Sequence, residues 1–270
     1  MSIRFIDAHL HLQDERILAQ AELIIARAES AGVQRFFCNA TRESDWQNIM
    51  GLARNHTGVV PFLGIHPRQA DSTAAGWEAR LAEALSCCSS GRAGIGETGL
   101  DKFASSGLQM QQKLFAAQLE IAADLFIPIC IHCVRCWKML LDTLERQAAG
   151  RGLPPVMIHS FSGSVETMHR LQQLGCLISY SLRMMNTQNA KLLNTFRQTP
   201  VEALLLETDA PDQLNAIPSR QPDFLTPYNE PLNVAALYRF GAEQRMMHLK
   251  DFANQLWNNA TIYTNQTPAR

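Results

Sequence analysis

Short apolar runs rich in branched side chains recur along the chain and alternate with stretches of helical periodicity. The runs that predict buried strands are residues 3–9, 33–39, 59–65, 93–97, 128–132, 155–159, 176–180 and 203–209. Helical stretches lie between them, at residues 16–32, 109–125 and 164–175. The last two place apolar residues at three- and four-residue steps, which is the spacing of one buried helix face.

Alternating buried strands and helices are typical of a parallel β/α architecture. The strand runs number eight, which is the count that closes a (β/α)8 TIM barrel, and 270 residues fit one such domain over positions 1–270. A doubly wound open sheet is the alternative, but it usually has a glycine-rich turn after its first strand, where this chain has HLHLQDE. The segment 211–231 is rich in proline and polar residues and is expected to be a long ordered loop after the last strand.

Composition narrows the function classes. Hydrophobic residues make up 46% and charged residues 18% of the chain, the balance of an ordinary folded enzyme and not of a disordered chain. The net charge is −1, so broad electrostatic capture of nucleic acid is excluded, and any contact with a polyanion must be local to a cleft.

Cysteine usage and the first residues predict a reducing, cytoplasmic location. The seven cysteines are odd in number and lack the density of a secreted disulfide scaffold. Acidic residues follow the N-terminus too soon for a secretion signal, and no apolar run approaches the ~20 residues of a membrane span. No obligate protein partner and no membrane association are indicated.

Polar side chains that can bind a metal stand where the predicted strands end. Parallel barrels bring such strand ends together on one face, where active sites are built. Four imidazoles and two carboxylates suit divalent ions and are enough for two of them. The six candidate ligands are His9, His11, Glu97, His132, His159 and Asp209.

The stretch PICIHCVRC offers a different chemistry, because Cys130, Cys133 and Cys136 have the spacing of an iron–sulfur ligand run or of a redox pair. Alternation along a strand places Cys130 one layer below His132, where a free thiol acts as a small hydrophobe. For all three cysteines to hold one cluster, His132 would have to leave the metal site. The histidine site is therefore the preferred interpretation.

The chain resembles the TatD-type metal-dependent hydrolases of the amidohydrolase superfamily. The matching stretches are IDAHLHL, LGIHP, GIGETGLD, PICIHC, MIHSFSG and LLLETDAP, followed by NEP and by NN at 258–259. This resemblance implies a (β/α)8 metal hydrolase of a family described chiefly as deoxyribonucleases. It also implies that His9, His11 and Asp209 hold one ion and that Glu97 bridges to a second, held by His132 and His159.

A carboxylate-bridged pair of Zn, Mg or Mn ions suits hydrolysis of phosphodiesters, with Glu97 as the bridge and Asp209 as general base. The expected substrate is a nucleic-acid end or another phosphodiester. Candidate substrate contacts are His66, Arg135, the backbone amides at Ser160 and Phe161, and Glu207. Of these, Glu207 lies one layer deeper than Asp209, which favours support of a ligand.

Two departures from the family pattern concern substrate choice. Tyr228 stands before NEP, where many relatives carry a basic residue that Arg220 could replace, and Lys102 follows GLD, where relatives often have an aromatic residue. A metal-dependent lactonase, esterase or amidohydrolase keeps the same ligands and is the competing enzyme hypothesis. A non-enzymatic binding protein predicts missing ligands, and none is missing.

Overall fold

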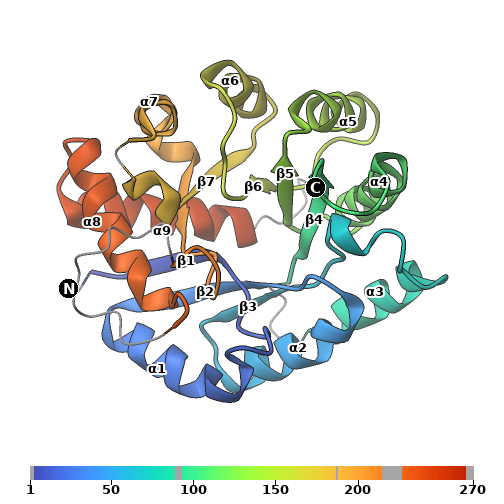
Figure 1. The fold of residues 1–270 in the computed structure, drawn as a ribbon, viewed down its shortest axis with the longest axis horizontal. Coiled ribbons are helices and arrows are strands. Elements are labelled where there is room, and N and C mark those ends of the chain that lie inside the picture. The colour runs from blue at the N-terminus through green and yellow to red at the C-terminus, as the bar shows by residue number, and fades with distance from the viewer. Residues whose placement is uncertain (1–2, 89–92, 187, 215–226, 266–270) are drawn as a thin grey trace.

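Parallel strands form the centre of the molecule, and helices surround them in the computed structural model (Figure 1). The structure describes residues 3–88, 93–186, 188–214 and 227–265. Its strands are β1 (Phe5–Leu10), β2 (Val33–Asn39), β3 (Val59–Phe62), β4 (Ile95–Asp101), β5 (Ile129–Val134), β6 (Val156–Ile158), β7 (Leu177–Ser181) and β8 (Leu204–Glu207). Its helices are α1 (Ala21–Ser30), α2 (Trp46–Asn55), α3 (Trp77–Ser86), α4 (Leu108–Leu125), α5 (Trp137–Gly150), α6 (Val165–Gln173), α7 (Ala190–Gln198), α8 (Val234–Gln244) and α9 (Leu249–Asn265).

The strands pair in chain order, as β1-β2-β3 and as β4-β5-β6-β7-β8. Backbone hydrogen bonds join the two groups at both edges. Leu63 N donates to Gly94 O at 2.9 Å on one side, and Asp209 N donates to His9 O at 3.0 Å on the other. These bonds close the strands into a ring, so the predicted α/β barrel is confirmed and the open sheet is not observed.

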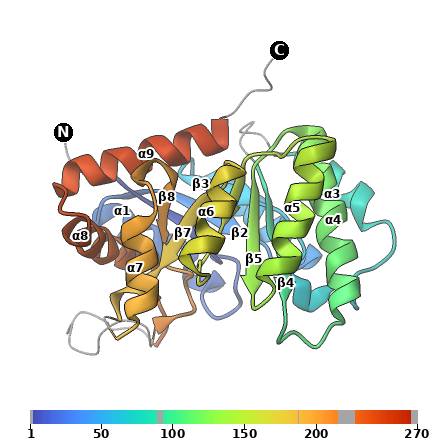
Figure 2. The ribbon, with the colours of Figure 1, turned by 90° about the horizontal axis from the view of Figure 1, so that it is seen from above.

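The barrel interior is filled by side chains from alternate positions of the strands. The inner cluster contains Ile6, Ala8, Phe37, Val60, Phe62, Cys130, Met157 and Leu205 from the strands, with Ala260 and Tyr263 from α9. Figure 2 shows α9 lying across one end of the barrel, away from the end toward which the arrow of β5 points. The helix therefore plugs one end, and the other end is left for a site.

Several predicted boundaries were wrong. The expected helix at 16–32 begins only at Ala21, because the chain first makes a turn in which the Asp14 side chain accepts from Arg16 N at 2.9 Å. Strand β4 runs on to Asp101, beyond the predicted end at residue 97, and most of the loop at 211–231 lies outside the described residues. None of the helices in the described ranges has the length and apolar character that a membrane span requires.

Candidate metal centre

Six side chains converge at the open end of the barrel, although they come from widely separated parts of the sequence. A break in the β1–β2 register between Asp7 and Leu10 lets His9 and His11 turn inward while Leu10 and Leu12 join the outer core. The remaining members of this metal-ligand cluster are Glu97 from β4, His132 from β5, His159 directly after β6 and Asp209 after β8.

A first set of ligand atoms surrounds one point. His9 Nε2 and His11 Nε2 are 3.2 Å apart, and each lies 3.5 Å from Asp209 Oδ1. Glu97 Oε2 lies 3.6 Å from His9 Nε2 and 3.5 Å from His11 Nε2. Two ligands of a tetrahedral ion with bonds of about 2.0–2.1 Å are separated by about 3.3 Å, so these four residues fit one ion.

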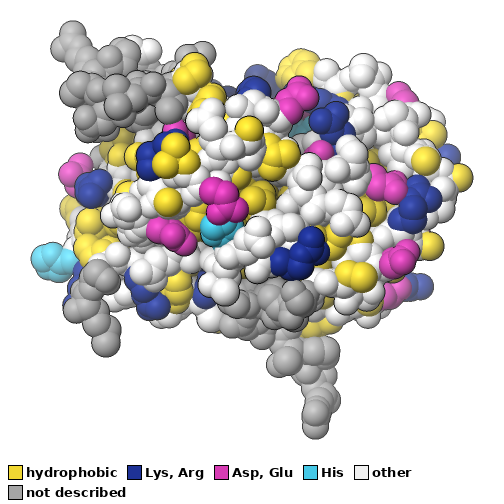
Figure 3. Space-filling model, turned by 90° about the horizontal axis from the view of Figure 1, so that it is seen from below, with side chains coloured by type: hydrophobic (Ala, Val, Ile, Leu, Met, Phe, Trp, Pro, Cys, Tyr) yellow, Lys and Arg dark blue, Asp and Glu magenta, His cyan; other side chains and the backbone are white. Residues whose placement is uncertain are grey.

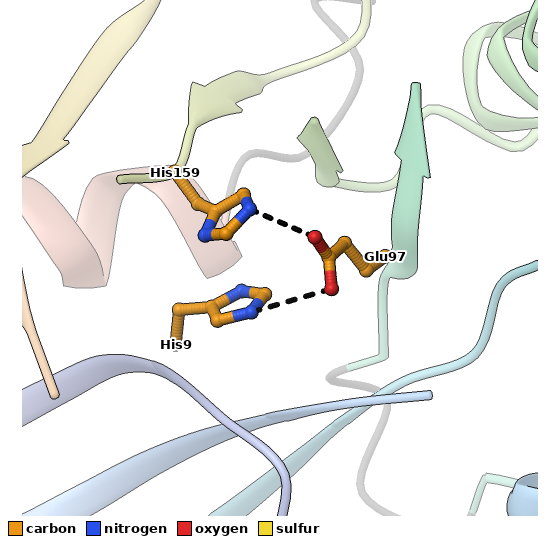
Figure 4. Close-up of side chains that lie close together, drawn as sticks. All are labelled: His9, Glu97 and His159. Atoms are coloured by element: carbon orange, nitrogen blue, oxygen red, sulfur yellow. Dashed lines mark ion pairs between the residues drawn. The ribbon is translucent and has the colours of Figure 1, made fainter. Parts of the chain in front are cut away.

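A second set uses the other oxygen of the same carboxylate. Glu97 Oε1 lies 2.7 Å from His132 Nδ1 and 2.8 Å from His159 Nε2, and these two nitrogens are 3.0 Å apart. Ligands at right angles around an ion with bonds of about 2.0–2.1 Å are separated by about 2.9 Å. Figure 4 shows Glu97 between His9 and His159, with one oxygen directed to each. The geometry therefore fits a carboxylate shared between two ion positions.

In two histidines, the ring nitrogen that points away from the ligand cluster is held by a strong hydrogen-bond acceptor. His11 Nδ1 donates to the Asn39 carbonyl oxygen at 2.8 Å, and His159 Nδ1 lies 3.3 Å from Glu207 Oε1. A proton on Nδ1 leaves Nε2 as the lone pair that faces the ligand cluster in both rings. Glu207 is fully buried and so supports His159 instead of lining the cavity, as its depth in the strand predicted.

The other two histidines have weaker outer partners. His9 Nδ1 lies 3.2 Å from Cys130 Sγ, and both residues are fully buried. His132 turns Nδ1 toward Glu97 and places Nε2 3.6 Å from Asp101 Oδ2. Cys130 therefore does more than pack, which the sequence interpretation missed. No group of three ligand atoms among the described residues includes a cysteine sulfur, so an iron–sulfur centre finds no support there.

The electrostatics of the cluster keep its carboxylates ionised. Burial opposes ionisation of Glu97, but the charges of His159 and His66 and the hydrogen bonds of His132 and His159 hold its pKa well below its usual value. Burial likewise opposes ionisation of Asp209, yet the hydrogen bond from His11 and nearby histidine charges lower its pKa to about 2. Both carboxylates are therefore available as anionic ligands at neutral pH.

His66 also faces the cluster, and by distance alone its ring could join Glu97 and His132 around an ion. Its Nδ1 accepts from Arg68 N at 3.0 Å, so in the neutral ring Nε2 carries the proton. Burial lowers the pKa of His66 to about 3, which keeps the ring neutral, and Nε2 lies 3.6 Å from Glu97 Oε1. His66 thus presents an N–H donor to whatever occupies the cavity.

Backbone strain gathers at the ends of the strands. Asp209 has a φ of 59°, Ser160 of 44° and Arg135 of 59°, which is the left-handed region that residues with a side chain seldom adopt. Gly99 has a φ of 137° and lies against the His132 carbonyl group, where a side chain would collide. Such outliers are commonly found at functional sites, where the fold compensates for their cost.

Three predicted substrate contacts are placed differently from what the sequence suggested. The Ser160 amide donates to Glu207 Oε1 at 2.7 Å and the Phe161 amide donates to Ser179 O at 3.0 Å, so neither is free to hold an anion. The Phe161 ring is buried against Trp137 and Tyr180. Arg135 is exposed and lines a neighbouring hollow, apart from the cavity that contains the metal ligands.

The cavity over the ligand cluster has a volume of about 310 Å³ and includes residues that sequence reasoning missed. Arg42 and Arg68 stand at its mouth. Gln213 Nε2 donates to Asp209 Oδ2 and lies 3.3 Å from Ser160 Oγ. Gln213 follows an expected strand end by only a few residues, and that position was its sole signal in the sequence.

The NEP stretch is structural. Asn229 Nδ2 donates to Thr208 O at 2.9 Å, and the Glu230 carboxylate pairs with Arg27 at 2.7 Å. These contacts tie the segment to the end of β8 and to α1. The suggested replacement of a basic residue before NEP by Arg220 falls outside the described residues.

Comparison with known proteins agrees with this geometry. A family model described as "TatD related DNase" matches residues 6–264. The chain belongs to this family. The "Uncharacterized metal-dependent hydrolase YjjV" of Escherichia coli K12 is 30% identical over 261 residues, covering 96% of this chain and 97% of that protein. The "3'-5' ssDNA/RNA exonuclease TatD" of Pantoea ananatis is 28% identical, covering 94% and 96% of the two chains.

Solved structures show the same fold. The crystal structure of YjjV from E. coli K12 has a TM-score of 0.87 at 29% identity and covers 99% of this chain and 100% of its own. A TatD family hydrolase from Entamoeba histolytica has a TM-score of 0.82 at 19% identity, with 99% and 100% coverage, and supports the fold alone. The protein is thus a metal-dependent, DNase-like hydrolase of the TatD-related DNase family.

Proposed function

We propose that this TatD-family protein hydrolyses phosphodiester bonds at or near the end of a nucleic-acid strand, using two divalent ions per chain. The observation that carries the proposal is that the two carboxylate oxygens of Glu97 face different pairs of histidines. Oε2 faces His9 and His11, and Oε1 faces His132 and His159. The proposal covers Zn, Mn and Mg: the imidazoles favour Zn, and the carboxylates also suit Mn and Mg. The relatives named as single-strand exonucleases support a nucleic-acid substrate.

The residues around the two ion positions have separate tasks in the proposed reaction. When bound, the ions would lower the pKa of a nearby water and offset negative charge on the phosphoryl oxygens. Asp209 accepts the proton of the attacking water, because its low pKa keeps it ionised and it lines the cavity over the ligand cluster. His66 donates its Nε2 proton in a hydrogen bond to a phosphate oxygen or to the leaving group.

The proposal extends to the whole chain. We assign residues 1–270 to a single barrel domain, and the continuous ring of strands supports this assignment. A reducing cytoplasm is supported by the cysteines, which are all free thiols. No obligate protein partner is proposed.

The deciding assay uses 3'- and 5'-end-labelled single-stranded DNA with added Mg, Mn or Zn, run beside simple esters and lactones. We expect stepwise shortening of the labelled strand with at least one of the ions. Rapid hydrolysis of a lactone or an ester, with DNA untouched under every ion, would instead assign the protein to the small-molecule hydrolases.

A further inference from the structure

A second hollow lies beside the metal cavity, at the ends of β4 and β5. Its volume is about 500 Å³, and its lining includes the cations Lys102, Arg135 and Lys138 with the apolar side chains of Leu108 and Met139. Three positive charges in one hollow are unusual for a chain whose net charge is −1. The hollow is therefore a local concentration of positive charge next to the metal-ligand cluster.

Two of the three cations are available to a ligand. Lys138 Nζ is paired with Asp142 Oδ2 at 2.6 Å, which accounts for the only carboxylate in the lining. The side chains of Lys102 and Arg135 are exposed, and neither makes an ion pair or a side-chain hydrogen bond within the described part of the chain. Their charges are thus not neutralised by a carboxylate there.

The cations of the hollow lie close in the chain to residues of the metal-ligand cluster. Lys102 follows Asp101, whose Oδ2 lies 3.6 Å from His132 Nε2, and its own amide donates to Val134 O at 3.0 Å. Arg135 is three residues after His132, a reach of at most about 10 Å along the chain. Both cations are therefore within one or two nucleotides of a phosphate held over the metal-ligand cluster.

The opposite side of the metal cavity carries the opposite charge. Asp14 and Glu15 after β1, and Asp212 after β8, line its mouth there. Arg16 pairs with both Asp14 and Asp212 at 2.7 Å, so this side carries three carboxylates and one guanidinium. A phosphodiester backbone is repelled on the β1–β8 side and attracted on the β4–β5 side. The mouth also carries Arg42, which pairs with Asp45 at 3.2 Å, and Arg68, which lies 3.5 Å from Asp101. On the face formed by α1 and α2, charges of both signs are interspersed (Figure 3).

We infer that the hollow of Lys102 and Arg135 binds the backbone phosphates of a single-stranded nucleic acid, and that the strand leaves the metal centre over β4 and β5. The inference rests on the proposed function and assigns the path of its substrate. Phe103, beside Lys102, is 74% exposed and offers an aromatic face on which a base can stack. Backbone contacts of this kind hold DNA and RNA alike.

The test compares charge reversals in matched pairs. Arg135→Glu is paired with Arg146→Glu, which lies in the following helix α5, about 13 Å along it from its first residue. Lys102→Glu is paired with Lys113→Glu on α4, whose side chain lines a different hollow. Binding of a fluorescent ten-nucleotide single strand, as DNA and as RNA, is measured by anisotropy with chelator present and over a range of salt.

We expect each of Lys102→Glu and Arg135→Glu to weaken binding about tenfold and to reduce the slope of log affinity against log salt by about 0.7. The control variants should bind as the wild type does. With metal present, the two hollow variants should lower kcat/KM for the oligonucleotide more than kcat/KM for bis(4-nitrophenyl) phosphate.

Equal weakening in the control variants, wild-type binding by the hollow variants, or no measurable binding by the wild type would each overturn the inference. An equal decrease of kcat/KM for bis(4-nitrophenyl) phosphate would also overturn it, because the substitutions would then have altered the metal centre and not the binding of the strand. Binding with chelator present does not require catalysis. A wild-type protein that binds the strand through the hollow but cleaves no phosphodiester refutes only the proposed function.

Discussion

Each histidine of the metal-ligand cluster turns one ring nitrogen toward Glu97 or Asp209 and the other toward a partner in the surrounding protein. The partners differ in strength: a carbonyl oxygen for His11, a carboxylate for His159 and a thiol for His9. A thiol is the weakest acceptor of the three. The orientation of His9 therefore depends most on packing, including its stacking on His159 at 3.9 Å between ring centroids.

Replacing Cys130 by Ala should weaken metal binding about tenfold, because His9 Nδ1 loses the sulfur that lies 3.2 Å away. Competition with a chromogenic chelator measures this affinity. The matched control is Cys133→Ala, which removes a buried thiol that packs in the outer core and should leave metal affinity unchanged. Equal affinities for the two variants and the wild type would leave Cys130 with a packing role alone.

Asp209→Asn should keep the fold and lose about 10²–10⁴-fold in turnover, since an amide cannot accept the proton of the attacking water. The amide oxygen can still occupy the position of Oδ1 beside His9 and His11. Turnover on labelled single-stranded DNA and metal content by elemental analysis are measured together. Substantial turnover by a metal-replete variant would remove Asp209 from the role of base.

Burial raises the pKa of Cys176, directly before β7, from 9.0 to about 12. Above pH 9 the unfolded chain loses this proton while the native chain keeps it, so the free energy of unfolding decreases as pH rises from about 9 to 12, by up to about 1.4 kcal/mol per unit. Urea unfolding at pH 8 and pH 10 should show a smaller alkaline loss in Cys176→Ala than in the wild type. An identical decrease in the free energy of unfolding for Cys176→Ala and the wild type would contradict the raised pKa of Cys176.

At the scale of elements, α9 is both a surface helix and the floor of the barrel. Its Asn259 Nδ2 donates to Val201 O at 2.7 Å and to Leu204 O at 2.9 Å, which fixes the helix beneath β8. Tyr263 enters the inner cluster, and its ring stacks on Phe62 at 6.0 Å between centroids. The Tyr263 hydroxyl is buried without a hydrogen-bond partner among the described residues.

Tyr263→Phe should therefore be neutral or stabilising, by up to about 1 kcal/mol, because it removes a buried hydroxyl that makes no hydrogen bond. Tyr180→Phe is the matched control and should destabilise by about 1 kcal/mol, since the Tyr180 hydroxyl bonds Thr199 Oγ1 at 2.8 Å. Chemical unfolding of both variants measures the difference. A larger loss for Tyr263→Phe than for Tyr180→Phe would mean that the Tyr263 hydroxyl has a partner.

The sequence predicted elements well where their pattern was apolar and poorly where it was not. Strand β4 continues through Thr98 and Gly99 to Asp101, but ETGLD has the composition of a turn, so the role of Asp101 beside His132 was missed. Boundaries of this kind are set by pairing with the neighbouring strand, here Asp101 with Val134, which no local pattern records.

The convergence of the six candidate ligands could be predicted, because parallel strands must end on one face. Which ring nitrogen each histidine uses, and the contact of Cys130 with His9, could not be predicted, since both depend on atoms from other strands. The misplacement of Arg135 has the same origin. Its backbone adopts a left-handed conformation and its side chain lines the neighbouring hollow, and sequence spacing alone predicts neither.

At the scale of the whole molecule, the purified protein should bind about two divalent ions per chain and lose thermal stability when they are removed. The His9→Ala/His11→Ala double variant should retain about one ion, because Glu97, His132 and His159 form the second set. Elemental analysis and thermal unfolding with and without chelator measure both effects. Iron with labile sulfide in the wild type, and no loss of metal in the variant, would refute the two-ion centre.

The ring of strands is closed by β1 and β8, and this closure has a consequence for the newborn protein on the ribosome. His9 emerges among the first residues, but its partner Asp209 is synthesised 200 positions later, and α9 later still. Until β8 and α9 have been synthesised, β1 lacks the strand that lies beside it in the closed ring, and no helix covers that end of the barrel. The ion set that includes Asp209 therefore cannot be completed before β8 is made, and a message truncated before β8 yields a chain with exposed apolar surface and five of the six candidate ligands, a natural target for chaperones and proteases.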